Sequence, residues 1–279
     1  MGPSKAHYEP RLVKAANSVL LEIAHLLQIY SDGFVVIGGS VPGLIIKNPP
    51  ESHIGSIDVD IALNQDKIPE KDYRTIKTLL IERGYSPAEQ PFTYSREVHI
   101  EGQVIKINVD FLAGEYGGRG AKHRTQRIQD LLLRKARACD LAFIQTISVE
   151  ITGQLPNGAK DQVVVQVASI VPFLMMKAQA LNGRMKEKDA YDIYYCIRNY
   201  PGGQQALVSA FQVFPPNKLV DEGLRILKDK FASPEHVGPA FITDFMAESD
   251  PETIKIIQRD AYERVNALLE SLDKDTVEQ

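Results

Sequence analysis

A short apolar run that ends in two glycines and a serine restricts the fold of this chain more than any other feature. The run extends from Phe34 to Ile37, and Gly38, Gly39 and Ser40 follow it directly. Apolar residues that stop at a glycine pair are typical of a buried strand followed by a tight turn. Backbone N–H groups in such a turn can hold a phosphate. The sequence therefore predicts a strand that delivers an anion-binding turn.

A second apolar run, residues 57–63, carries two aspartates. Asp58 and Asp60 stand two residues apart, and Ser56 precedes the run. If the run is a strand, its period of two places both carboxylates on the same face. Paired carboxylates bind hard cations such as Mg²⁺. Together with the glycine turn, the pair predicts nucleotide chemistry.

A third carboxylate, Asp110, lies in the alternating run 104–112. The alternation places Lys106, Asn108 and Asp110 on one face of the expected strand. A strand with two aspartates beside a strand with one more is the usual way to assemble the carboxylate triad of a two-metal site. We therefore expect Asp58, Asp60 and Asp110 to be catalytic and to bind metal.

Composition limits the possible functions. The chain has 279 residues and a net charge of -4, from 32 basic and 36 acidic residues, which is unlike a protein that binds nucleic acid by overall charge. It has 2 cysteines, too few for a disulfide framework or a cysteine-rich zinc site, and this predicts a cytoplasmic protein. No membrane span is expected, because the most apolar stretch, residues 163–176, is shorter than the roughly 20 residues that a span needs. The histidines show no ligand spacing, so we assign none of them to catalysis.

Periodicity predicts an α+β fold, with a mixed sheet, flanking helices and a mainly helical C-terminal domain. We expect two domains, residues 1–170 and 171–279. The expected strands are 34–37, 57–63, 97–100, 104–112, 147–151 and 163–168. The expected helices are 12–30, 72–83, 173–199, 219–231 and 253–272.

A charged face marks the long helix expected at 173–199. At about 100° per residue, one face carries four charged residues, and Asp189 falls to the side of it. This arrangement favours Asp192 over Asp189 as a candidate base. The four are Lys177, Arg184, Lys188 and Asp192.

The order of these motifs resembles a known family. Gly-Gly-Ser, then Ser-Ile-Asp-Val-Asp, then Val-Asp-Phe-Leu resembles the minimal nucleotidyltransferases of the DNA polymerase β superfamily. The later pattern of Lys177, Arg184 and Lys188-Asp189 to Asp192 looks like the AbiEii/AbiGii-type nucleotidyltransferases, the toxins of bacterial abortive-infection systems. The two motifs together cover residues 34 to 200, and they imply that the mixed sheet is of the nucleotidyltransferase type.

The resemblance implies roles for individual residues. Gly38, Gly39 and Ser40 would hold nucleotide phosphates, and Ser56 would support the site. Mg²⁺ would be the cofactor, bound by the three aspartates of the sheet. Lys177 would contact the triphosphate, Arg184 and Lys188 would offset its charge, and Asp192 would act near the acceptor.

The implied activity is transfer of a nucleoside monophosphate from an NTP to an acceptor, driven by positioning and charge neutralisation. RNA or tRNA would be the acceptor, and a separately encoded antitoxin would be the partner of this toxin. Two alternatives remain open. The acceptor could be a small molecule or a protein, or the chain could be a nucleotide-binding module without turnover.

Each motif also has a structural explanation. Asp-x-Asp can be a solvated strand edge, and a glycine pair can be only a turn. The charged face can be an exposed helix in which Arg184 pairs with Glu187 and Lys188 with Asp192. The basic segment 119–137 suits phosphate contacts or a solvated helix face equally well.

Overall fold

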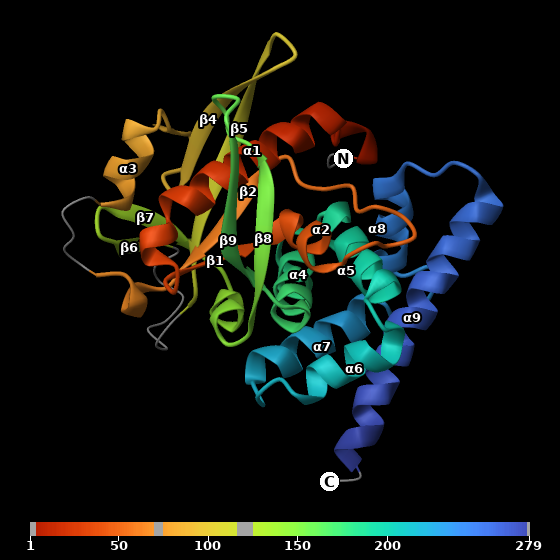
Figure 1. Cartoon of the computed structure of the whole chain (residues 1–279). Helices are drawn as coiled ribbons and strands as arrows, with labels where there is room; N and C mark the ends of the chain where they lie inside the picture. Colours follow the sequence, from red (N-terminus) through yellow and green to blue (C-terminus); the bar gives the residue numbers. More distant parts are fainter. Residues whose placement is uncertain (1–3, 70–74, 116–124, 278–279) are drawn as a thin grey trace. The chain divides into compact units, whose positions relative to one another are not determined.

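The computed structural model describes residues 4–69, 75–115 and 125–277 (Figure 1). The chain divides into two compact units. The sheet unit consists of Tyr8–Leu44 and Gly55–Ser169. The helical unit consists of Ile45–Ile54 and Ile170–Gln279, together with the first seven residues. Each unit has its own core, and we describe each by itself.

The sheet unit is built on one mixed sheet of 9 strands. Its main path runs β3-β4-β5-β2-β1-β9-β8, and β7 joins β5 and β6 beside that path. Parallel pairs join β1 to β9, β2 to β5 and β5 to β7, whereas the other pairs are antiparallel. The strands are β1 (Phe34–Ile37), β2 (Val59–Leu63), β3 (Ser86–Pro87), β4 (Thr93–Ile100), β5 (Gln103–Ala113), β6 (Thr125–Ile128), β7 (Leu131–Lys135), β8 (Thr146–Gln154) and β9 (Lys160–Ala168).

Helix α1 (Pro10–Leu26) packs across this sheet against β4, β5, β8 and β9 (Figure 1). Pro10 suits the first helical position, because a proline lacks only an N–H that would have no partner there. Its apolar residues recur at helical spacing, and Val19, Ile23 and Ala24 have no exposed surface. Burial of this stripe attaches α1 to the sheet.

Shorter elements complete the sheet unit. They are η2 (Gln28–Tyr30), η3 (Gly38–Ser40), α2 (Val41–Ile45), η4 (Gln65–Lys67), α3 (Ile76–Glu82) and η6 (Cys139–Phe143). Helix α3 begins at a Thr75 cap, whose hydroxyl accepts from the Thr78 N–H. The 3-10 turn η3 directly continues β1, so the glycine turn is held by a buried strand.

The helical unit packs its helices around α4 and α5. Helix α4 contacts α5 and α7, α5 contacts α8, and α9 contacts α6, α7 and α8. Gly223 of α7 allows close packing on α4, because a Cβ there would lie 2.3 Å from Met175 Sδ. The helices are α4 (Ile170–Arg184), α5 (Glu187–Asn199), α6 (Gly203–Gln212), α7 (Lys218–Lys230), α8 (Val237–Met246) and α9 (Pro251–Val277), and η1 (Lys5–His7) belongs to the same unit.

The predicted α+β class is confirmed: a mixed sheet with flanking helices is followed by a helical C-terminal region. No helix among the described ranges is long and apolar enough to cross a membrane. The domain limits 1–170 and 171–279 stay a prediction about folding units.

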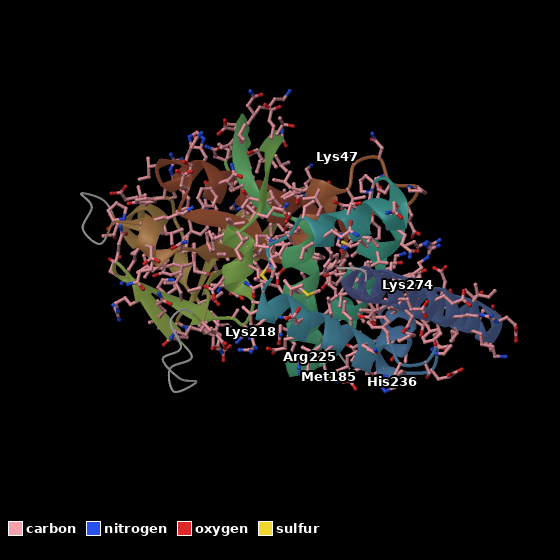
Figure 2. The ribbon with its side chains drawn as sticks, turned by 90° about the horizontal axis from the view of Figure 1, so that it is seen from below. Lys47, Met185, Lys218, Arg225, His236 and Lys274 are labelled. Atoms are coloured by element: carbon pink, nitrogen blue, oxygen red, sulfur yellow. The ribbon has the colours of Figure 1, made fainter. Side chains whose placement is uncertain are left out.

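The single helix expected over 173–199 is wrong. The chain leaves α4 after Arg184 and re-enters a helix at Glu187. Met185 between them has φ 50°, a left-handed conformation that a helix interior does not contain. It stands exposed at the surface of the helical unit, where Figure 2 labels it. The face argument built on one continuous helix therefore fails.

The basic segment 119–137 does not form a helix in its described part. Residues 125–128 and 131–135 are the antiparallel strands β6 and β7, which add to the sheet. Residues 119–124 lie outside the described residues, as do residues 72–74 of the helix expected at 72–83. The helix expected at 12–30 ends earlier, at Leu26, and is followed by η2.

Candidate functional site

Two groups of polar side chains emerge from the fold. The carboxylate edge comprises Asp58, Asp60 and Asp110 with the turn Gly38–Ser40, all in the sheet unit. The charge cluster comprises His53, Lys177, Arg184, Lys188, Asp189 and Asp192, all in the helical unit. Each group is described within its own unit.

In the carboxylate edge, Asp60 of β2 stands directly opposite Asp110 of β5 in a parallel pair. Residues paired in this way point to the same face of a sheet, and neighbouring strands are only about 4.8 Å apart. Both aspartates are half-buried. Two carboxylates held so close produce a local negative potential that favours a positively charged ligand.

Hydroxyl groups donate hydrogen bonds to two carboxylates of the edge, Asp58 and Asp110. Ser56 Oγ donates to Asp58 Oδ1 at 2.5 Å, and Thr93 Oγ1 donates to Asp110 Oδ1 at 2.5 Å. Asp58 itself is exposed and lies on a bend just before β2, which begins at Val59. The strand period therefore does not extend to Asp58, and only Asp60 and Asp110 are placed by sheet register.

The glycine turn packs against this edge. Gly38 has φ 72°, and a Cβ at that position would lie 1.9 Å from Asp60 Oδ2. Only glycine combines this backbone conformation with this approach. Gly39 is buried and Ser40 is half-buried. The turn and Asp60 are therefore one packed unit.

In the charge cluster, Asp192 is fully buried and surrounded by basic groups. His53 Nε2 donates to Asp192 Oδ1 at 2.8 Å, and Lys188 Nζ donates to the same oxygen at 2.7 Å. Lys177 Nζ lies 2.7 Å from Asp192 Oδ2, as an ion pair. The side chain of His53 is 1% exposed, so the whole arrangement is interior.

Asp189 forms the second centre of the cluster. Arg184 binds it through two nitrogens, Nε to Oδ2 and Nη2 to Oδ1, both at 2.7 Å. Lys177 Nζ donates to Asp189 Oδ1 at 2.9 Å, so the lysine joins the two carboxylates. A forked arginine–carboxylate pair is among the stronger polar contacts in proteins. The cluster is therefore a connected network.

The pKa values follow from this network. Burial would raise the pKa of Asp192, but Lys177, Lys188 and His53 hold it well below its ordinary value. Burial would likewise lower the pKa of Lys177, but Asp189 and Asp192 raise it. For His53 burial prevails over the hydrogen bond to Asp192, and its pKa is lowered. The cluster thus contains charged carboxylates and ammonium groups beside a neutral imidazole.

Tyrosines of α5 attach the segment Ile45–Ile54 to the helices. Tyr195 Oη donates to the Glu51 carbonyl at 2.8 Å. The His53 ring packs against Tyr191 and Tyr195, with ring centroids 5.7 and 4.7 Å away. Lys47, labelled in Figure 2, is exposed in the same segment. The aromatic contacts hold the His53 ring against Asp192.

The structure brings together Lys177, Arg184, Lys188 and Asp192, as the sequence predicted, but for a different reason. They meet where two helices face each other, and Asp189 is an equal member rather than a residue to the side. The alternative of an exposed helix is also wrong, because Asp192 and Asp189 are 0% and 1% exposed. The pair Lys188–Asp192 forms, whereas Arg184 pairs with Asp189.

Sequence reasoning missed His53. It lies 139 residues from Asp192 along the chain, so no local spacing could reveal the pair. The roles predicted for Gly38, Gly39, Ser40, Ser56, Lys177, Arg184 and Lys188 as binding residues stay predictions, as do those for Asp58, Asp60, Asp110 and Asp192.

Comparison with known proteins gives two relatives of one kind. Both are named ubiquinone/menaquinone biosynthesis C-methyltransferase UbiE, from Rhodopseudomonas palustris strains HaA2 and BisB5. Each is 32% identical over 146 residues, which is 52% of this chain and 55% of the relative. The chain thus spans about half the length of the curated relatives it matches. No family model matches the chain. No solved structure matches it either.

These relatives correct the predicted function. They are named as methyltransferases, so the assignment to the AbiEii/AbiGii-type nucleotidyltransferases of the DNA polymerase β superfamily is wrong. Nucleotidyl transfer as the reaction and an abortive-infection toxin–antitoxin role are wrong for the same reason. NTP, RNA or tRNA, and an antitoxin find no support as partners.

The prediction of Mg²⁺ as the cofactor is wrong as well. The relatives are named as C-methyltransferases, so the nucleotidyl transfer for which Mg²⁺ was expected loses its support. Within residues 4–69, 75–115 and 125–277, no three or more His, Cys, Asp or Glu side chains are grouped so that they could hold a metal ion. Asp58 is exposed and lies before the start of β2, so it does not share the strand with Asp60.

Proposed function

We propose that this chain is a transferase that transfers a methyl group from S-adenosylmethionine. The carboxylate pair Asp60 and Asp110 carries the proposal, because their parallel register sets two negative charges side by side. The match of 146 residues to two C-methyltransferases supports the choice of reaction. The nature of the acceptor is left to the experiment below.

The chemistry of the side chains fits the donor in charge. S-adenosylmethionine supplies a methyl group on a positively charged sulfur, and a nucleophilic acceptor displaces that sulfur. Asp60 and Asp110 would offset the positive charge, and their oxygens accept hydrogen bonds from amino or hydroxyl groups. Asp58, which is exposed beside them, would add to the same negative potential.

The glycine turn would take part by close approach. Gly38, Gly39 and Ser40 follow β1 directly, and the turn contacts Asp60. Backbone without a Cβ lets a ligand come near the main chain. Ser56 would support the edge through its hydrogen bond to Asp58.

We also propose the finer topology, a sheet of the nucleotidyltransferase type. Its support is the order of elements: β1 leads into the glycine turn, β2 returns antiparallel with Asp60, and β5 lies parallel to β2 with Asp110. A fold does not determine a reaction, so this topology is separate from the proposed methyl transfer. We also propose a cytoplasmic location, because the two cysteines are free and buried, as is usual in a reducing compartment.

Calorimetric titration with S-adenosylmethionine tests the function. We expect the unmodified protein to bind S-adenosylmethionine. Asp60→Asn and Asp110→Asn should each bind it at least about tenfold more weakly, because each removes a charge-assisted contact. Asp130→Asn makes the same chemical change at an exposed position and should bind normally.

Labelled methyl transfer into a cell extract then tests turnover and identifies the acceptor class. If S-adenosylmethionine does not bind, or if ATP binds and S-adenosylmethionine does not compete with it, the proposed methyl transfer is wrong. Binding that is equal in Asp60→Asn and the unmodified protein would remove the carboxylate pair from the site.

A further inference from the structure

A cavity lies at the carboxyl ends of β2 and β5, where its lining begins three residues beyond Asp60 and Asp110. Its volume is about 200 Å³, and it is lined by residues that follow β2 and β5, by Gln126 of β6 and by η6. The strands β2, β5 and β7 run parallel and end at Leu63, Ala113 and Lys135. Ligands of open α/β sheets commonly bind outside the carboxyl ends of parallel strands. The cavity therefore occupies a favourable position for a ligand, and neither Asp60 nor Asp110 is in its lining.

Asp140 is one of the two carboxylates that line this cavity. It is half-buried on η6, and a Cβ on Gly114 would lie 1.5 Å from Asp140 Oδ1. The Glu115 N–H donates to the same carboxylate. A glycine is therefore required for the carboxylate to occupy its place beside the end of β5.

The turn that presents Asp140 starts with a strained residue. Ala138 precedes η6 with φ 66°, a left-handed conformation that costs an alanine of order 1 kcal/mol or more. Ala138 is also 1% exposed, so packing holds it there. Such strain is found most often where a structure must aim particular groups. Here it directs η6, with Asp140 and Phe143, to the cavity.

The lining has a definite chemical character. Asp66 and Asp140 provide carboxylates, and no lysine or arginine is among the described residues that line the cavity. Amide side chains provide further acceptors, and Phe143 and Ile144 provide an apolar wall. Burial and the neighbouring Glu115 carboxylate raise the pKa of Asp140, so the charged form of Asp140 would gain from a positive partner.

We propose that this cavity binds a small organic cation, with its ammonium group on Asp140 and its apolar part against Phe143 and Ile144. The volume of about 200 Å³ lies below the roughly 300–1,000 Å³ of cavities for drug-sized molecules, so the ligand must be smaller than a drug-sized molecule. Carboxylates recognise ammonium groups by charge-assisted hydrogen bonds, and an aromatic ring adds to the attraction. The inference does not depend on the proposed methyl transfer.

The test uses two probes of the same shape, benzylamine and benzyl alcohol, titrated into the full chain and followed by NMR. We expect benzylamine to bind about tenfold or more tightly than benzyl alcohol, because only the amine carries a charge. The preference should weaken as salt is added. Resonances of Gly114 and Ile144 should shift on binding.

Asp140→Asn should remove the preference for the amine. Asp161→Asn makes the same change in β9, on another part of the sheet unit, and should retain it. If Asp140→Asn does not fold, the comparison of the two probes on the unmodified chain still tests whether the cavity prefers an ammonium group. Equal binding of amine and alcohol, absence of binding by benzylamine, or shifts that avoid Gly114 and Ile144 would each overturn the inference.

Discussion

Replacement of Asp192 by asparagine should strongly destabilise the helical unit. Asp192 is 0% exposed and contacts Lys177, Lys188 and His53 at 2.7 to 2.8 Å. The substitution keeps the size of the side chain and removes its charge. It therefore leaves two buried ammonium groups without the carboxylate that they share.

The magnitude follows from the surroundings. Removal of one partner of a buried ion pair costs about 3–5 kcal/mol, because the remaining charge cannot recover its hydration. Lys177 and Lys188 are 9% and 11% exposed, so neither reaches water easily. Lys177 retains Asp189, which favours the lower part of that range. Asp189→Asn should cost less, because the side chain of Arg184 is 41% exposed and can rehydrate.

Urea unfolding, followed by circular dichroism, measures these free energies, and hydrogen exchange of residues 187–199 locates the effect in α5. Asp273→Asn is the control, since that side chain is 77% exposed and its substitution should change the free energy by under about 0.5 kcal/mol. A cost below about 1 kcal/mol for Asp192→Asn, or equal costs for the two aspartates, would refute the reasoning.

Three further predictions concern single positions. Acid should destabilise the helical unit through His53, because burial lowers the pKa of its imidazole in the folded state. The stability that the neutral imidazole contributes is fully present above about pH 6.5 and is lost as the pH falls through the folded-state pKa. His53→Gln should reduce the difference in unfolding free energy between pH 7.5 and 5.5. If the difference is undiminished in this variant, the loss of stability in acid comes from other groups. Gly38→Ala should cost more than about 1 kcal/mol in urea unfolding, because its Cβ would meet Asp60, whereas Gly43→Ala in α2 has no atom within 4 Å and should be neutral or stabilising. Tyr195→Phe should cost about 1 kcal/mol and speed hydrogen exchange of residues 45–54, because it removes the hydrogen bond to Glu51, and unchanged exchange would contradict that role.

Much of the sheet could be predicted because its signals are local. The strand 34–37 has the predicted limits, and the strands expected at 104–112 and 163–168 lie within β5 and β9. These segments alternate or are continuously apolar between turn residues, which is the information that a single chain carries. The strands β6 and β7 were missed because Arg127, Arg134 and Lys135 gave the segment a basic character that concealed its alternation.

The break between α4 and α5 could not be predicted, because it depends on Met185, a residue without a turn preference. The charge cluster was predicted in part, since four of its residues lie within a short stretch of sequence. Its burial and its histidine could not be predicted, because they arise from contacts between distant segments. The sequence predicted that the strands of Asp60 and Asp110 are neighbours, and parallel pairing of β2 with β5 sets the two residues opposite each other. It also predicted that Asp58 shares the strand of Asp60, which is wrong because β2 begins one residue after Asp58.

The position of Ile45–Ile54 in the helical unit also determines when that unit can be completed during synthesis. His53 leaves the ribosome 139 residues before Asp192. At about 5–20 residues per second, the histidine waits roughly 7–28 s for its partner. The sheet unit has emerged in full during that interval, up to Ser169. A nascent chain stalled at this length would therefore present the ten residues from Ile45 to Ile54 as a loop without its helices, and accessible to proteases.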